Sequence, residues 1–258
     1  MGWKYRRSNT IETKPLPQTA GSVVKSDISQ SIGAANQDSS TDTPVPSKQT
    51  VSETPVKEFQ TTKSVFQNVP FTSQAPSGEW SDPMFQDGCE EASMIMSMAW
   101  VRGSTLTPES AKAAIESITQ FETTKFGTFM SDTSAEDTAQ VMRDYYEYKN
   151  VTVVHDTSID ALKNFLIEGD LVMAPMNGQA LGNSNFTQPG PLHHMLVIIG
   201  YDVQTHEFVT NDPGTRKGER YRYNENVLYQ ALRDYPTSNT EQPVTDNQKT
   251  IIVVKKNG

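Results

Sequence analysis

Residues 86–100 read QDGCEEASMIMSMAW and predict a helix that begins at a cysteine. One face of this helix has the apolar spacing i, i+3, i+4 and i+7, at Ala92, Ile95, Met96 and Ala99. Gly103 follows as a typical helix end. Cys89 comes directly after the turn residues QDG. It therefore lies in the first helical turn, where unpaired backbone amides lower the pKa of a thiol.

Cys89 is the only cysteine in the chain, which excludes an intramolecular disulfide. A lone cysteine is more often a small core residue than a nucleophile, but its place at a loop-helix junction favours the catalytic interpretation. Glu90 and Glu91 follow at once, and their charges oppose a thiolate. A catalytic Cys89 therefore needs an imidazolium partner.

The second decisive stretch is HHMLVIIGYD, residues 193–202. Its continuous apolar run is typical of a core strand, and HEFVTNDP, residues 206–213, is expected to pair with it as a hairpin. His193 and His194 stand where a polar loop enters this strand, so either imidazole can face a cleft. A structural role for either histidine is equally compatible with the sequence.

Asp212 lies in the run Asn-Asp-Pro-Gly, residues 211–214, at the end of the second hairpin strand. A carboxylate there can reach an imidazole at the start of the neighbouring strand and fix its tautomer. The same four residues are also a turn signal, so a purely local role stays open. The histidines, Cys89 and Asp212 fall at no recognised zinc spacing, and no metal site is predicted.

The remaining pattern predicts an α+β fold, with helices first and an antiparallel sheet later. Helices are expected over residues 107–118, 134–148, 159–168 and 224–233. Strands are expected over residues 151–155, 171–175 and 250–256, after a short first strand that breaks at Pro76. The run from residue 151 to residue 175 has a local β-α-β rhythm, and the polar loop 177–192 is expected to form a cleft wall.

Four motifs in order, VPFTSQAP, GCEEAS, HHMLVIIGYD and FVTNDPGT, resemble the papain-like cysteine peptidase superfamily, in the branch of the bacteriocin-processing, double-glycine-leader peptidases. The likeness covers about residues 65–254. It implies a papain-like fold with the nucleophile, Cys89, at the N-terminus of a helix packed on an antiparallel sheet. In this family the base lies six residues before the Gly of a Gly-Tyr-Asp turn, which gives His194 and not His193. The family's orienting carboxylate falls on Asp212.

The resemblance also implies an oxyanion hole formed in part by a glutamine side-chain amide. Gln74 matches that position by its VPFTSQ context, and Gln86, three residues before Cys89, is the rival. The sequence departs from the family pattern at two places. Glu90 and Glu91 replace the usual Gly-Pro, and GEWSDPMFQD lengthens the interval between Gln74 and the cysteine.

The function implied is that of a thiol-dependent hydrolase, a cysteine peptidase that cleaves peptide amide bonds through an acyl-enzyme on Cys89 and needs no cofactor. One alternative is a catalytically inactive domain of the same fold that binds peptide or cell-wall material. Glu90 and Glu91 motivate this alternative, and the presence of Cys89, His194 and Asp212 together argues against it. A second alternative is an acyltransferase that uses the same site.

Composition divides the chain into a tether and a domain. Residues 8–63 are dominated by Ser, Thr, Pro, Gln and Asp without periodicity, so residues 1–63 are expected to be disordered and residues 64–258 to form the domain. That domain holds 14 basic and 25 acidic residues, which makes nucleic acid an improbable partner.

Neither a secretory signal nor a membrane span is predicted from the sequence. The basic N-terminal start lacks an apolar run of about 7 to 15 residues, and no stretch reaches about 20 apolar residues. An extracellular or cell-surface location would need a longer N-terminus, and the sequence leaves localisation undetermined.

Overall fold

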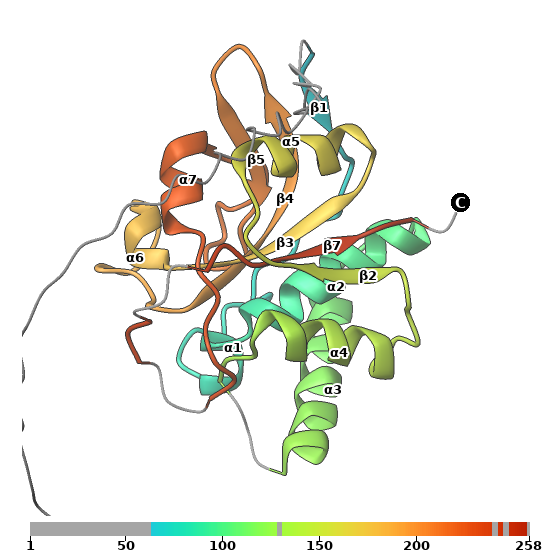
Figure 1. The fold of residues 1–258 in the computed structure, drawn as a ribbon. Coiled ribbons are helices and arrows are strands. Elements are labelled where there is room, and N and C mark those ends of the chain that lie inside the picture. Colours follow the sequence, from blue (N-terminus) through green and yellow to red (C-terminus); the bar gives the residue numbers. More distant parts are fainter. Residues whose placement is uncertain (1–62, 128–130, 239–241, 245–247, 257–258) are drawn as a thin grey trace, which may run out of the picture. The chain divides into compact units, whose positions relative to one another are not determined.

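The computed structural model describes residues 63–127, 131–238, 242–244 and 248–256, which fold around a single β-sheet (Figure 1). The predicted tether over residues 1–63 lies outside the described residues except for its last member. Within the described ranges, no helix is long and apolar enough to cross a membrane.

Seven strands form the antiparallel sheet in the order β2-β7-β3-β4-β5-β6, with β1 paired to β4. Their bounds are β1 (Val65–Phe66), β2 (Val151–Val154), β3 (Leu171–Met176), β4 (His194–Asp202), β5 (Glu207–Asn211), β6 (Tyr221–Asn224) and β7 (Ile251–Val254). The expected hairpin of β4 and β5 is confirmed, and Asp202 pairs with Glu207 at its closed end. The sheet with its helices confirms the α+β class.

Seven helices lie in the described residues. They are α1 (Pro83–Gln86), α2 (Cys89–Arg102), α3 (Pro108–Phe126), α4 (Ala135–Tyr145), α5 (Ile159–Ile167), α6 (Gly178–Leu181) and α7 (Glu225–Ala231). The two short ones, α1 and α6, and the strand β6 were not predicted. The third helix was predicted too short, because Thr119 to Phe126 continue it to a left-handed end at Gly127.

Both faces of the sheet are covered by helices, which explains why its central strands are apolar along their whole length. The helices α2, α3 and α4 pack on one face, and α5 and α7 pack on the other (Figure 1). Successive residues of β4 alternate between the two cores. Met195 and Val197 join the core with α2, whereas Leu196 and Ile198 join the core with α5 and α7.

The predicted β-α-β order is present as β2, α5 and β3, but β2 and β3 are not neighbours in the sheet. The last strand, β7, lies between them and pairs antiparallel with both. Leu171 and Val151 therefore share the same partner, Val254, instead of pairing with each other. The last described strand of the chain is inserted between β2 and β3, and no local pattern over residues 151–175 could indicate that.

The helix α2 is buried on all sides and carries the predicted nucleophile at its first position. Every residue from Cys89 to Trp100 is buried, not only those of the predicted apolar face. Gly103 ends the helix with a φ of 64°, a left-handed conformation that glycine adopts without strain. The helix is thus a fixed support for Cys89 in the centre of the domain.

The segment before α1 is held against the sheet mainly by side chains and turns, since only Val65 and Phe66 form a strand. Gly200 allows this pairing, because a Cβ atom there would lie 2.4 Å from the Val65 carbonyl oxygen. Further along, the Asn211 side-chain amide donates to the Val69 carbonyl (3.2 Å). These contacts bring the chain from β1 to the end of β5, where the predicted site residues lie.

Two buried glutamates lie side by side between α2 and α3. Glu122 is 2% exposed, no donor among the described residues reaches its carboxyl oxygens, and its protonated carboxyl group is hydrogen-bonded to Glu91. Burial and the adjacent Glu91 carboxylate raise the pKa of Glu122 to about 11. Glu122 therefore keeps its proton at neutral pH, which allows the two carboxyl groups to be neighbours.

Glu122→Gln should flatten the pH dependence of stability. Because the folded-state pKa is raised, the stability present below the ordinary glutamate pKa is lost as pH rises toward about 11. The amide of the variant carries no charge at any pH. We expect the Tm measured by circular dichroism between pH 6 and pH 10 to fall less in Glu122→Gln than in the wild type. Glu116→Gln, an exposed change on α3, is the control and should behave like the wild type; an equal slope in all three proteins would contradict the assignment.

Candidate active site

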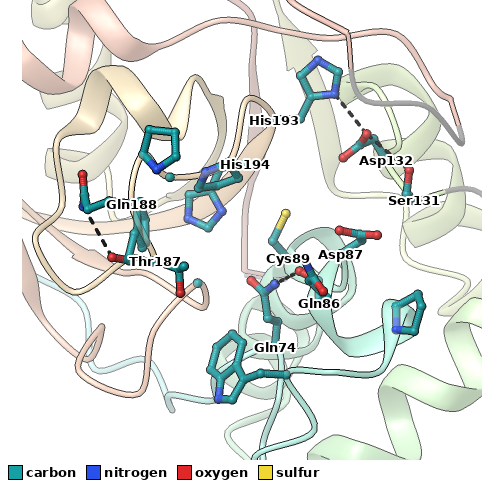
Figure 2. A pocket seen from close by; sticks show the side chains of 17 residues that line it. Gln74, Gln86, Asp87, Cys89, Ser131, Asp132, Thr187, Gln188, His193 and His194 are labelled. Carbon is teal, nitrogen blue, oxygen red and sulfur yellow. Dashed lines mark hydrogen bonds and ion pairs between the residues drawn. The ribbon is translucent and has the colours of Figure 1, made fainter.

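A cavity of about 820 Å³ lies where α2 meets the start of β4. Cys89, His194 and Gln74, three of the four predicted site residues, line it. Figure 2 shows the Cys89 sulfur pointing into this space, with His194 on one side and the pair of His193 and Asp132 on the other. The fourth predicted residue, Asp212, is fully buried behind His194 and does not line the cavity.

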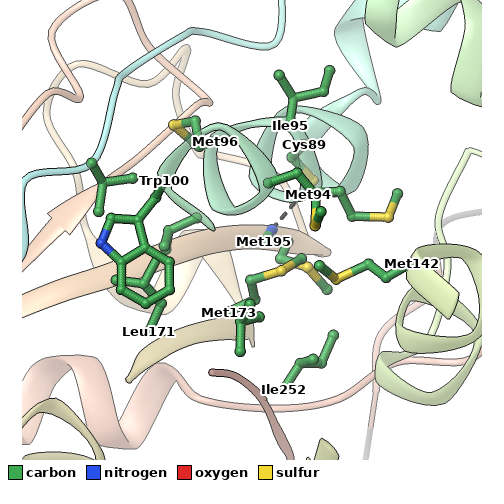
Figure 3. Close-up of a cluster of buried hydrophobic side chains, with 14 of the residues drawn as sticks. Cys89, Met94, Ile95, Met96, Trp100, Met142, Leu171, Met173, Met195 and Ile252 are labelled. Carbon is green, nitrogen blue, oxygen red and sulfur yellow. Dashed lines mark hydrogen bonds between the residues drawn. The ribbon is translucent and has the colours of Figure 1, made fainter. Parts of the chain in front are cut away.

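Cys89 is held between its own helix and β4. Its Sγ accepts a hydrogen bond from the Met195 amide (3.2 Å), at the edge of the methionine-rich core (Figure 3). The thiol donates to Glu90 Oε2 (3.0 Å). Among the described residues, no hydrogen bond joins Sγ to the His194 ring. In this structure the candidate nucleophile, Cys89, is therefore hydrogen-bonded to the carboxyl group of Glu90 and not to the candidate base, His194.

The surroundings of Cys89 favour the neutral thiol. Burial raises the pKa of the Cys89 thiol well above its ordinary value, and the charge and hydrogen bond of Glu90 and the charge of Asp132 raise it further. Only the Met195 amide acts in the opposite direction among these causes. The structure therefore agrees with the expectation that the acidic residue after Cys89 opposes formation of the thiolate.

His194 is the first residue of β4, and its ring is fixed from two sides. Nε2 donates to Asp212 Oδ1 (2.8 Å), which leaves Nδ1 as the nitrogen that can take a proton from a thiol. The Phe186 ring lies edge-on to the imidazole with 5.2 Å between centroids. Gly214 is required beside the imidazole, because a Cβ atom at that position would lie 2.9 Å from His194 Cε1. The glycine of the Asn-Asp-Pro-Gly turn therefore also makes room for the histidine.

Asp212 is 0% exposed and is surrounded by hydrogen-bond donors. Besides His194, the Gly214 amide donates to Oδ1 (3.0 Å), while the Tyr223 hydroxyl (2.5 Å) and the Asn183 amide (3.2 Å) donate to Oδ2. Burial alone would raise the pKa of Asp212, but the imidazole and these donors outweigh it and lower that pKa. A buried, ionised carboxylate behind an imidazole can hold the ring tautomer and stabilise its protonated form.

Tyr223 and Asn183 were not predicted. Tyr223 lies on the unpredicted strand β6, and Asn183 lies in the polar loop after α6. The alternation of aromatic and polar residues in YRYN, residues 221–224, was the only local signal for that strand. Nothing near Asn183 distinguishes it from the other asparagines of its loop.

Gln74 reaches the cavity through its attachment to the turn that carries Asp212. Its backbone amide donates to the Pro213 carbonyl (2.9 Å), and its side-chain Nε2 donates to the Gln86 carbonyl oxygen. The rival, Gln86, also lines the cavity, but its side chain is exposed. Nε2 of Gln74 carries a second hydrogen, and Oε1 is buried without a hydrogen-bond partner among the described residues. The geometry favours Gln74 over Gln86 as the side chain next to Cys89.

A second histidine-carboxylate pair forms the opposite side of the cavity. His193 is 4% exposed, its Nδ1 lies 3.0 Å from Asp132 Oδ2, and its Nε2 lies 2.7 Å from the Gln242 carbonyl oxygen. The Tyr235 ring stacks on the imidazole, with 4.6 Å between centroids and 6° between planes. Both adjacent histidines are therefore buried and partnered, each with a different aspartate. In the described part of the chain, no three His, Cys, Asp or Glu side chains lie close enough to hold a metal ion.

A cysteine lies at a helix N-terminus and shares a cavity with an imidazole at the start of a core strand, and a carboxylate lies behind that imidazole. This arrangement is that of the papain-like cysteine peptidase class. The sequence pattern of the Peptidase_C39 like family matches residues 66–239, and the chain belongs to this family. The match includes Cys89, His194, Asp212 and Gln74.

A crystal structure from Bacillus anthracis, of a C39-like peptidase that was itself assigned to that class provisionally, is similar to this chain. It aligns over 76% of this chain and 98% of its own length, with 17% sequence identity and a TM-score of 0.43. No curated protein is significantly similar to the chain in sequence. The family, and not an individual relative, is what these comparisons establish.

Tyr223→Phe should destabilise the domain at neutral pH and flatten its loss of stability in acid. Because the pKa of Asp212 is lowered in the folded state, the stability it contributes is present above its ordinary pKa and is lost as pH falls. Removing a donor to a buried carboxylate costs about 1.5–3 kcal/mol at neutral pH and brings the folded-state pKa of Asp212 closer to its ordinary value, so less stability is left to lose as pH falls. Tm measured between pH 3 and pH 7 checks this. Tyr221→Phe is the matched control, since the Tyr221 hydroxyl makes no hydrogen bond among the described residues; equal acid sensitivity of both variants would contradict the role of Tyr223.

Proposed function

We propose that this chain is a cysteine peptidase that hydrolyses peptide amide bonds through an acyl-enzyme on Cys89. The observation that carries the proposal is the buried pair of His194 and Asp212, in which the carboxylate engages Nε2 and leaves Nδ1 for the Cys89 thiol that lines the same cavity. Membership of the Peptidase_C39 like family supports the same class of reaction.

The proposed reaction begins when the Cys89 thiol transfers its proton to His194 Nδ1, and Sγ bonds to the carbonyl carbon of the substrate. The carbonyl oxygen becomes an oxyanion, which the Cys89 amide at the helix N-terminus and Nε2 of Gln74 stabilise. The protonated His194 then gives its proton to the leaving amine as the carbon-nitrogen bond breaks. Water, deprotonated by His194, attacks the thioester and releases the acid and the thiol. Throughout, Asp212 keeps Nε2 protonated and offsets the charge of the imidazolium.

The charges around the cavity bear on the substrate. Asp87 and Asp132 line it, and none of its described lining residues is Lys or Arg. An adjoining cavity of about 440 Å³ shares the Trp80 wall and carries Arg216 and Lys217. This arrangement supports substrates that are neutral or basic at the larger cavity, with acidic groups tolerated only toward Arg216 and Lys217.

The hydrogen bond from the Cys89 thiol to Glu90 favours a second candidate function, that of an inactive domain that binds peptide without cleaving it. Incubation of the full chain with a mixture of synthetic peptides, followed by mass spectrometry, separates the two. A peptidase gives cleavage products with the wild type and none with Cys89→Ala. Retention of intact peptides by both proteins supports the binding domain, and products that incorporate added methylamine reveal acyl transfer by the same site.

Gln74→Ala should reduce kcat for a peptide substrate by about 10²–10³-fold, the usual cost of one oxyanion donor. Cys89→Ala and His194→Ala should reduce it further, because they remove the nucleophile and the base. Gln86→Ala is the matched control, since its side chain is exposed and only its backbone carbonyl contacts Gln74. A larger loss of kcat in Gln86→Ala than in Gln74→Ala would reverse the assignment of the oxyanion donor.

A further inference from the structure

Glu90 is a buried carboxyl group beside the nucleophile for which the proposed mechanism has no use. It is 1% exposed and is the second residue of α2. Its Oε2 accepts the hydrogen bond from the Cys89 thiol (3.0 Å). Its Oε1 accepts from the Tyr235 hydroxyl (2.7 Å) and lies 3.4 Å from the Thr133 amide. Both oxygens are thus engaged, one of them by the candidate nucleophile.

We propose that Glu90 is a positioning residue for the nucleophile: it accepts a hydrogen bond from the Cys89 thiol and holds the resting thiol away from His194. This inference rests on the proposed peptidase function, because it assigns His194 as the base from which Cys89 is withheld. A catalytic cycle then begins when the S–H bond of Cys89 rotates from Glu90 toward His194 as the substrate enters. Glu90 touches neither the substrate nor the bond that is cleaved.

The hydrogen bonds of the sulfur explain why Glu90 competes with His194. A thiol has one proton to donate, and in this structure Glu90 Oε2 receives it. The Met195 amide occupies another direction around Sγ. Transfer of the proton to His194 Nδ1 therefore requires the S–H bond to leave Glu90 first.

The carboxyl group of Glu90 is fixed by segments that are distant in the sequence. Tyr235 follows α7 and is 145 positions away, and its ring stacks on His193. His193 in turn lies 3.0 Å from Asp132, which precedes α4 together with Thr133. The second histidine-aspartate pair of the cavity thereby acquires a role, since it supports the tyrosine that holds Glu90.

The titratable groups that face Glu90 come from four separate segments of the chain. Cys89 and Glu91 belong to α2, Asp132 precedes α4, Tyr235 follows α7, and His193 precedes β4 behind the tyrosine. Burial, Asp132 and Glu91 raise the pKa of Glu90 well above its ordinary value, and the hydrogen bonds from Cys89 and Tyr235 offset only part of this rise. The carboxyl group in turn raises the pKa of Cys89. Glutamine keeps the size of the side chain but cannot ionise and oppose the thiolate in the pH range where Cys89 titrates, so it should favour the thiolate.

Glu90→Gln tests the proposal through the rate of iodoacetamide labelling of Cys89 against pH, without substrate. We expect the midpoint of the labelling curve to fall by at least one pH unit, which makes labelling at pH 7 about tenfold faster. Glu91→Gln is the matched control, with the same chemical change at the next residue, whose carboxyl bonds to Thr119 and not to the sulfur. Its midpoint should equal that of the wild type.

An unchanged or higher midpoint in Glu90→Gln, or an equal shift in Glu91→Gln, would overturn the role of Glu90. If Glu90→Gln does not fold, Tyr235→Phe keeps the stacked ring and removes only the hydroxyl that holds Glu90. It should lower the midpoint by a smaller amount, and no change would overturn the proposal. Peptide hydrolysis is measured separately. Cleavage by the wild type with an unshifted Glu90→Gln midpoint rejects the Glu90 role alone, and a shifted midpoint without cleavage by any variant rejects the peptidase function alone.

Discussion

Pairing between β4 and β5 is the constraint on which the candidate site depends, because it brings His194 and Asp212 to the same end of these two strands. The ladder ends at the pair of Val197 and Asn211, so the next residue, Asp212, turns back toward the start of β4. Apolar side chains on both faces of β4 fix this register, since a slip by one residue would exchange the two cores. The Met195 amide then links the same strand to the sulfur at the start of α2.

Three buried carboxyl groups of the domain, two of them at the site, lie in different electrostatic settings. Asp212 has four hydrogen-bond donors and is stabilised as an anion, as an orienting carboxylate requires. Glu90 has the thiol, the Tyr235 hydroxyl and the Thr133 amide, but it also lies near other acids. Glu122 has no donor among the described residues and keeps its proton. The anion is thus favoured behind the imidazole and disfavoured beside the nucleophile, which describes a resting enzyme whose thiol is neutral.

The features predicted from the sequence were those encoded locally. The helix that begins at Cys89 and the hairpin that follows His194 each have their own periodicity, and their positions relative to turns placed both side chains at element ends. Contacts between distant segments could not be read in the same way. The bond between Tyr235 and Glu90 joins residues 145 positions apart, and Tyr223 reaches Asp212 from a strand too short and polar to stand out. The placement of β7 between β2 and β3 likewise depends on the whole sheet. The catalytic roles of Cys89, His194, Asp212 and Gln74 remain predictions that the geometry supports.

The most direct test of the account is the mass of a covalent acyl adduct on Cys89 after a brief reaction with an activated peptide ester and an acid quench. The partnership of Cys89 with His194 predicts an adduct in the wild type, its loss in His194→Ala, and its persistence in His193→Ala, where the adjacent imidazole is removed instead. An adduct that survives in His194→Ala, or that disappears only in His193→Ala, would contradict the assignment of His194 as the base.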